Sequence, residues 1–188
     1  MLRRVLCLAV MLAGVANARA DALDELLHRF AAHTAGHATF TEVHQYAMLK
    51  HPLRASGELR YAAPDYLEKR TLKPRPETLV LSHGMLTVER AGHRRQVELA
   101  AYPQLVPFIE SIRATLAGDR GALEKYFVTD LSGADSGWSL RLTPRPGKLE
   151  HSVAEVRLSG AGDVIRRVDI RLTDGDHSTL DITPDPTP

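Results

Sequence analysis

The sequence is poor in cysteine and in aromatic residues. Its one cysteine, Cys7, lies close to the N-terminus, and aromatic residues make up only 5% of the chain. Without Cys7 the protein would have neither disulfide bonds nor a thiol nucleophile. The charges are nearly balanced, with 24 Lys and Arg against 23 Asp and Glu. A nucleic-acid-binding protein is not indicated, because its signature is a concentrated positive patch.

The sequence also lacks an apolar run long enough to span a membrane. The run over residues 5–15 is short, whereas a membrane-spanning helix needs about twenty apolar residues. It follows two arginines and precedes Ala18-Arg19-Ala20, which places small residues where a signal peptidase reads the chain. This order predicts a cleavable signal peptide over residues 1–20 and export from the cytoplasm. The mature chain, residues 21–188, would keep no cysteine and 21 basic against 23 acidic residues, and is expected to form one domain.

Apolar periodicity predicts three helices in the mature chain. The first follows Asp21, and its apolar residues are Leu23, Leu26, Leu27 and Phe30. The second begins near Pro103, and its apolar stripe consists of Leu105, Phe108, Ile109, Ile112 and Leu116. Gly118 ends this helix, and Asp119 can cap a short third helix that carries Leu123 and Phe127.

Alternating apolar residues predict five or six strands before the second helix and four after the third. His83-Gly84 is a two-residue hairpin signal, and Asp174-Gly175-Asp176 is a further turn. Strands joined by short turns are antiparallel, and their alternation gives each strand one apolar face. Three helices are too few to cover both faces of a parallel sheet. We therefore expect a mainly β (α+β) fold, a strongly curved antiparallel sheet of about ten strands with the helices on its concave side.

The nine histidines and the serines form no recognisable catalytic or metal-binding motif. His33 and His37 are four residues apart, as zinc ligands on a helix can be, but Gly36 lies between them and no HExxH motif is present. No GxSxG elbow occurs, and the turn at Asp174 lacks the glutamate that completes a calcium loop. We predict no catalytic residues, no metal, no cofactor and no enzymatic activity. A hydrolase is a third interpretation that rests only on scattered histidines and serines.

The densest positive stretch consists of Arg90, His93, Arg94 and Arg95. Such a stretch could meet an acidic partner or anionic lipid head groups. A solvated hairpin is the simpler interpretation, and it is the one we prefer from the sequence.

The order of these elements and several local strings resemble a known family. The strings are FTE at residues 40–42, SGELRYAAPD at 56–65, LSHGML at 81–86, LAGD at 116–119 and WSLRLTP at 138–144. In this order and spacing, over roughly Asp21 to Ile182, they resemble the periplasmic outer-membrane lipoprotein carrier proteins of the LolA type. One departure marks a divergent member. Ala63 stands before Pro64 in a turn where the carriers have an arginine that ties the lid shut.

The resemblance implies a half-open β-barrel with a lid of about three helices over an apolar cavity. It also implies a periplasmic chaperone that shelters the acyl chains of a lipoprotein or related acylated lipid on its way to the outer membrane. Its partners would be this cargo, an inner-membrane release complex and an outer-membrane acceptor. We expect a monomer without a nucleic-acid partner. The alternative is a non-carrier envelope module of the same fold, which senses lipid or binds a signalling protein.

The cavity residues are expected on the inward faces of the strands and beneath the second helix. The predicted lining consists of Phe40, Leu59, Tyr61, Leu79, Leu81, Leu86, Val88, Trp138, Leu140 and Leu142. The predicted lid residues are Leu105, Phe108, Ile109, Ile112 and Leu116. For any single residue, a place in an ordinary filled core is the alternative, so the prediction concerns the set.

Overall fold

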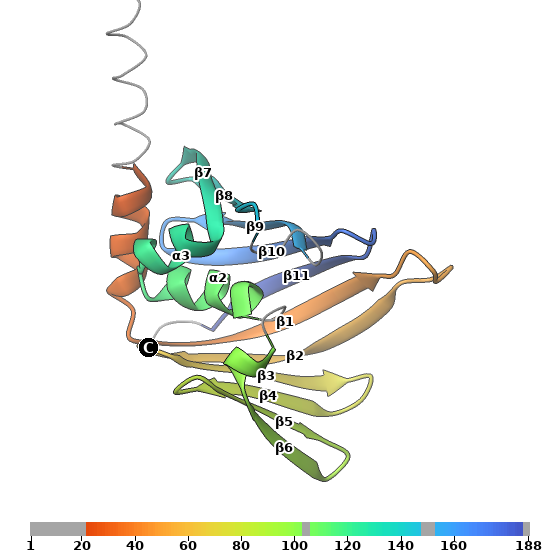
Figure 1. Ribbon diagram of the computed structural model, residues 1–188. Helices are drawn as coiled ribbons and strands as arrows, with labels where there is room; N and C mark the ends of the chain where they lie inside the picture. The colour runs from red at the N-terminus through yellow and green to blue at the C-terminus, as the bar shows by residue number, and fades with distance from the viewer. Residues whose placement is uncertain (1–21, 103–105, 148–152, 186–188) are drawn as a thin grey trace, which may run out of the picture.

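The computed structural model of the chain describes residues 22–102, 106–147 and 153–185. Its main feature is one strongly curved antiparallel sheet with helices on the concave side (Figure 1). The predicted signal peptide lies outside the described residues. Within them, no helix is both long enough and apolar enough to cross a membrane.

Six strands precede the central helices. They are β1 (Ala35–Gln45), β2 (Leu53–Ala62), β3 (Tyr66–Lys73), β4 (Glu77–Ser82), β5 (Met85–Arg90) and β6 (His93–Glu98). The short helix η1 (Leu99–Ala101) leads towards α2 (Val106–Leu116) and α3 (Arg120–Tyr126). The remaining strands are β7 (Phe127–Ala134), β8 (Gly137–Pro144), β9 (Val153–Ala161), β10 (Val164–Leu172) and β11 (His177–Pro184).

The described strands form an eleven-stranded sheet in the order β6-β5-β4-β3-β2-β1-β11-β10-β9-β8-β7. Every neighbouring pair is antiparallel. The two hairpins nearest to the β6 edge turn through His83-Gly84 and Ala91-Gly92, all four with positive φ, as the twist of a two-residue hairpin requires. The predicted fold class is confirmed, and the His83-Gly84 turn with it.

β7 is the strand that the sequence pattern does not predict. The helical spacing assigns Phe127 to the third helix, but α3 ends at Tyr126 and Phe127 begins β7. The N-cap is as predicted, since the Asp119 carboxylate accepts a hydrogen bond from the Ala122 N–H at 2.9 Å. Pairing of β7 along β8 covers what would otherwise be an open sheet edge at β8. This pairing explains why Phe127 has an extended backbone although its spacing continues the apolar pattern of α3.

A filled core lies on the C-terminal half of the sheet, β7 to β11. A helix over residues 22–31 packs onto it through the predicted residues Leu23, Leu26, Leu27 and Phe30, all buried. The Phe30 ring meets the Trp138 ring edge-on, with centroids 5.6 Å apart. Gly118, just after α2, allows close packing, because a Cβ there would lie 2.6 Å from the Leu27 carbonyl oxygen.

Candidate functional site

The strand register places the ten predicted lining residues on the same face of the sheet. Tyr61 and Leu81 lie in one cross-strand row through β2, β3, β4 and β5, and Leu59 and Leu79 lie in the next row. On the other half, Leu140 lies in a row with Leu158, Val168 and Leu180. On β1, Glu42 pairs with Leu180, and Phe40 lies two residues from Glu42, so Phe40 is on the same face. Helix 22–31 packs against the same face, which is therefore the concave one.

The structure divides the predicted lining into two groups. Phe40, Trp138, Leu140 and Leu142 belong to the filled core with helix 22–31, and each is at most 5% exposed. The other six lie on β2, β4 and β5: Tyr61, Leu81 and Leu86 are buried, and Leu59, Leu79 and Val88 are half-buried. Of these six, only Leu59 packs against the described part of the filled core.

The concave face of the N-terminal half changes from apolar to polar along its strands. The row that we call the deep row is apolar throughout and consists of Tyr61, Leu67, Leu81, Leu86 and Val97. The next row contains two cations among its aliphatic residues and consists of Leu59, Lys69, Leu79, Val88 and Arg95. The third row has no large apolar residue and consists of Gly57, Thr71, Glu77, Arg90 and His93.

Helix α2 packs through small residues and not through its apolar stripe. Its buried residues are Ser111, Ala114 and Thr115, each 0% exposed. The hydroxyls of Ser111 and Thr115 donate to backbone carbonyls of α2 itself, at 2.7 and 2.6 Å, so their burial leaves no donor unpaired. At 3.6 residues per turn, this buried face is roughly a third of a turn away from the apolar stripe.

The apolar stripe of α2 is consequently only half-buried. Its described members are Phe108, Ile109, Ile112 and Leu116, while Leu105 lies outside the described residues. Among the described residues, none of these four belongs to the filled core or packs against it. Figure 1 shows α2 on the concave side of the sheet. Neither the described part of the stripe nor the deep row belongs to the filled core, and we refer to the two together as the second apolar surface.

Tyr61, at one end of the deep row, lies near α2. Burial raises the pKa of its hydroxyl above the ordinary value, and the positive charge of Arg113 on α2 opposes this rise. The hydroxyl is buried and has no hydrogen-bond partner among the described residues. Arg113 is engaged within its own helix, 2.7 Å from the Glu110 carboxylate. Ala63 is exposed in the β2–β3 turn.

A buried carboxylate on the concave face was not predicted from the sequence. Glu42 on β1 is 6% exposed and forms an ion pair with Lys69 on β3 at 2.5 Å. Its carboxylate also lies 3.1 Å from His44 Nε2 and accepts a hydrogen bond from the Ser178 hydroxyl at 3.1 Å. Lys69 and Glu42 lie on the two strands that flank β2. On β2, Gly57 allows the close approach of β3, because a Cβ there would lie 1.9 Å from the Arg70 carbonyl oxygen.

The partners of Glu42 keep it ionised. Burial by itself raises the pKa of this carboxyl, but the hydrogen bonds and positive charges of His44 and Lys69 outweigh burial and lower the pKa from 4.5 to about 2. The Lys69 ammonium also lies 5.1 Å from the centre of the Phe40 ring. The cluster of Glu42, Lys69, His44 and Ser178 thus forms a polar group on the concave face, beside Phe40 of the filled core.

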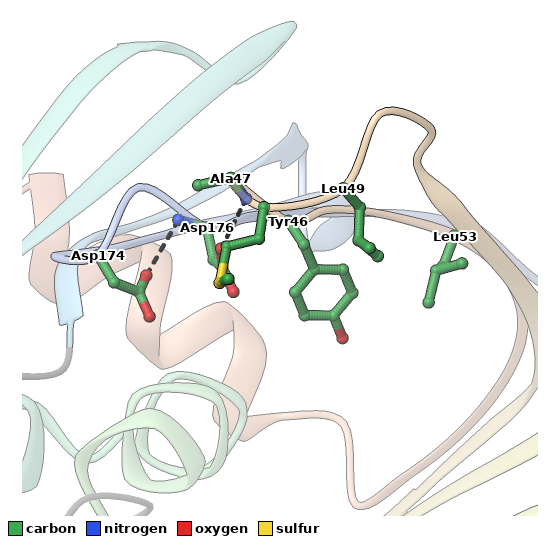
Figure 2. A pocket seen from close by; sticks show the side chains of 7 residues that line it. Tyr46, Ala47, Leu49, Leu53, Asp174 and Asp176 are labelled. Atoms are coloured by element: carbon green, nitrogen blue, oxygen red, sulfur yellow. Dashed lines mark hydrogen bonds between the residues drawn. The ribbon is translucent and has the colours of Figure 1, made fainter.

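The structure contains a hollow of about 400 Å³ at the tip of the β1–β2 hairpin. It is lined by Tyr46, Ala47, Met48, Leu49, Leu53, Asp174 and Asp176. The side chains of Tyr46, Leu49 and Leu53 point to the same side of the hairpin (Figure 2). The Asp176 carboxylate accepts a hydrogen bond from the Ala47 N–H at 2.9 Å, which joins this hairpin to the β10–β11 turn. None of the predicted lining residues is part of this hollow.

The histidines at the end of the first helix do not share a site. His33 Nε2 lies 2.6 Å from an Asp163 carboxylate oxygen, and His37 Nδ1 lies 2.5 Å from one of Asp185. The hydrogen bond to His33 lowers the pKa of Asp163. Across the described ranges, no group of three His, Cys, Asp or Glu residues is placed to hold a metal ion.

The sequence of the chain matches a known protein family. The sequence profile of the family described as outer membrane lipoprotein carrier protein LolA-like matches residues 15–182. The chain belongs to this family. The match spans most of the chain and confirms the LolA-type resemblance found in the sequence. A comparison with curated protein sequences found no match.

Solved structures with a similar fold come from several bacteria. A LolA superfamily protein from Nitrosomonas europaea is 11% identical, with a TM-score of 0.46 over 87% of this chain and 94% of that one. A DUF1329 family protein from Desulfovibrio piger is 12% identical, with a TM-score of 0.48 over 88% and 91%. The MucA/MucB complex of Pseudomonas aeruginosa gives 13% identity and a TM-score of 0.44 over 88% and 58%.

Proposed function

We propose that this protein is a periplasmic carrier that shelters acyl chains of a lipoprotein or a related acylated lipid. The observation that supports this proposal is the second apolar surface, where the α2 stripe and the deep row lie outside the filled core. A helix that served only to complete the core would bury its apolar stripe. Here α2 buries Ser111, Ala114 and Thr115 and leaves Phe108, Ile109 and Ile112 half-buried.

The energetics of acyl chains favour this use of the surface. Exposing each methylene to water costs about 0.8 kcal/mol, so an extended acyl chain costs on the order of 10 kcal/mol. A carrier therefore needs a continuous apolar surface more than precisely placed polar groups. The deep row and the α2 stripe provide aliphatic and aromatic side chains for this purpose.

The polarity gradient of the concave face suggests an orientation for the cargo. The apolar end of the chain would lie along the deep row beneath α2. The polar head would lie towards the third row, where Thr71, Glu77 and Arg90 offer polar groups. The buried Tyr61 hydroxyl is one donor within the apolar part that could meet an ester carbonyl.

The carrier role includes the remaining expectations from the sequence. Residues 1–20 would direct the chain to the periplasm and be removed, which leaves residues 21–188 as one binding domain without enzymatic activity. The protein would work as a monomer between an inner-membrane donor and an outer-membrane acceptor. With Ala63 in place of the carriers' arginine, lid closure would rest on apolar contacts of α2 instead of a turn-to-lid ion pair.

Native mass spectrometry of the chain purified from the periplasm tests the proposal. We expect a bound acylated species on the wild type, its loss in Ile112→Asp, and its retention in Val128→Asp. Val128 is a matched control because it is an apolar residue on β7, 49% exposed and not part of the α2 stripe or the deep row. A chain that is always recovered without an acylated species would instead support the envelope module that binds a protein partner.

A further inference from the structure

We propose that the tip of the β1–β2 hairpin, residues 46–53, docks on an anionic membrane surface. This docking tip is apolar, exposed and flanked by cations. The inference does not depend on the identity of any carried molecule. It would hold equally if the protein bound no acyl chain.

The docking tip exposes several large apolar side chains to solvent. Met48 is 97% exposed, Leu53 is 52% exposed and Leu49 is 49% exposed. Tyr46, 37% exposed, stacks on His44 with ring centroids 5.9 Å apart. Single exposed apolar residues are common, but a contiguous cluster around a hollow is typical of an interaction site.

The charges around the docking tip have one predominant sign. No acidic residue occurs between Glu42 and Glu58, whereas Lys50 and Arg54 are both exposed. The β3–β4 and β5–β6 turns lie at the same end of the antiparallel sheet as the docking tip (Figure 1). Their exposed cations are Lys73, Arg75, Arg90, Arg94 and Arg95. The basic stretch noted in the sequence thus shares one end of the molecule with the apolar tip.

Acidic residues also lie at this end of the sheet. The Asp176 carboxylate accepts from the Ala47 N–H, and the Asp174 carboxylate accepts from the Asp176 N–H at 3.0 Å. Glu77 lies 3.7 Å from Arg90 in an ion pair. Glu89 lies opposite Arg94 in the strand register. The seven cations named above outnumber these four acidic residues, so the charge at this end is predominantly positive.

Apolar side chains surrounded by cations match an anionic bilayer. The apolar residues can enter the interface between head groups and acyl chains, while Lys and Arg side chains lie at the level of the phosphates. Each cation near such a surface strengthens binding by about fivefold. If the proposed carrier function is correct, docking would also bring the polar end of the concave face close to the membrane.

Co-sedimentation with vesicles tests this proposal. The chain is purified from the periplasm, its N-terminus is checked by mass, and it is mixed with vesicles of equal parts phosphatidylglycerol and phosphatidylcholine. We expect binding that weakens as salt is added. The double variant Met48→Asp with Leu49→Asp should bind about a hundredfold more weakly, because it removes two large apolar side chains from the interface. Lys50→Gln with Arg54→Gln should bind about 25-fold more weakly.

Val128→Asp is the matched control, since Val128 is as exposed as Leu49 but lies on the edge strand β7. It should bind like the wild type, and thermal unfolding should confirm that all variants fold. Equal binding to vesicles of phosphatidylcholine alone would overturn the anionic surface as the partner. Absence of vesicle binding, or unchanged binding of the Met48 and Leu49 variant, would overturn the proposal and favour a protein partner for the tip. Loss of vesicle binding with a retained acylated species would leave the carrier function intact.

Discussion

The two halves of the sheet treat their concave faces differently. On β7 to β11, helix 22–31 packs Leu26, Leu27 and Phe30 onto the concave face of the strands, and the result is a close-packed core. On β2 to β6, the strands present a comparable apolar row that is not part of this core, and α2 buries Ser111, Ala114 and Thr115 instead of its apolar stripe. The same sheet thus carries one apolar surface that stabilises the fold and a second that the fold does not use fully.

From this difference we expect folding stability and binding to depend on different residues of the chain. Substitutions in the filled core should cost large amounts of folding free energy, because they leave cavities that cannot collapse. Substitutions on the second apolar surface should cost little folding free energy and should instead affect binding. The predictions below test this separation.

The largest effect is expected for Phe127→Ala, because Phe127 is 0% exposed in the filled core. The free energy of unfolding, measured by urea denaturation, should fall by about 4 kcal/mol. The neighbouring substitution Val128→Ala should change it by less than about 0.5 kcal/mol, since Val128 is exposed. Similar losses for both variants would mean that β7 does not seal the core.

Glu42→Gln should lower the free energy of unfolding by about 3 kcal/mol at neutral pH, because the folded-state pKa is about 2 instead of 4.5. A lowered carboxyl pKa stabilises the fold above pH 4.5, and the contribution is lost as the pH falls towards 2. The stability of the variant should therefore vary less with pH in this range. Unfolding measured across this pH range checks the slope, with exposed Glu98→Gln as control. An unchanged slope would contradict the ion-pair assignment.

Tyr61→Phe should raise the free energy of unfolding by about 1 kcal/mol, because it removes a buried hydroxyl that has no partner among the described residues. Thermal unfolding of the chain without cargo measures the change. A clear loss of stability would show that the hydroxyl is hydrogen-bonded in the folded protein.

A small stability effect is also expected on the α2 stripe. Ile109→Ala should lower the free energy of unfolding by less than about 1 kcal/mol, since Ile109 is half-buried and outside the filled core. Ala114→Leu is the contrasting variant on the same helix. Its buried position has no room for a larger side chain, and the cost should be about 2 kcal/mol. The reverse order of the two costs would place the stripe in the core.

Local sequence patterns predict much of the fold. The spacing of Leu23, Leu26, Leu27 and Phe30 identifies the helix that fills the core, and two-residue turns identify the hairpins. β7 is missed because Phe127 continues the helical spacing of α3, and only pairing with β8 decides its conformation. The orientation of α2 is missed for a related reason. Periodicity shows which face of a helix is apolar, but not which face will pack.

The polar cluster at Glu42 depends on contacts that no local pattern contains. Glu42 on β1 and Lys69 on β3 form an ion pair although β2 lies between their strands. The pairs His33 with Asp163 and His37 with Asp185 likewise join distant parts of the chain. The docking tip could have been noticed from Tyr46, Met48, Leu49 and Leu53 near Lys50, because these apolar residues continue beyond the end of the alternating strand.

Site-specific photocrosslinking tests most directly whether the second apolar surface holds acyl chains and the filled core does not. A photoreactive phenylalanine derivative is placed at Phe108 on the α2 stripe and, in separate variants, at Phe30 in the core and at exposed Val128. The cells are irradiated and the protein is recovered from the periplasm. We expect an acylated species crosslinked to the protein at position 108, and no such crosslink at positions 30 or 128. Equal yields at 108 and 128, or no acylated species from 108, would contradict the account.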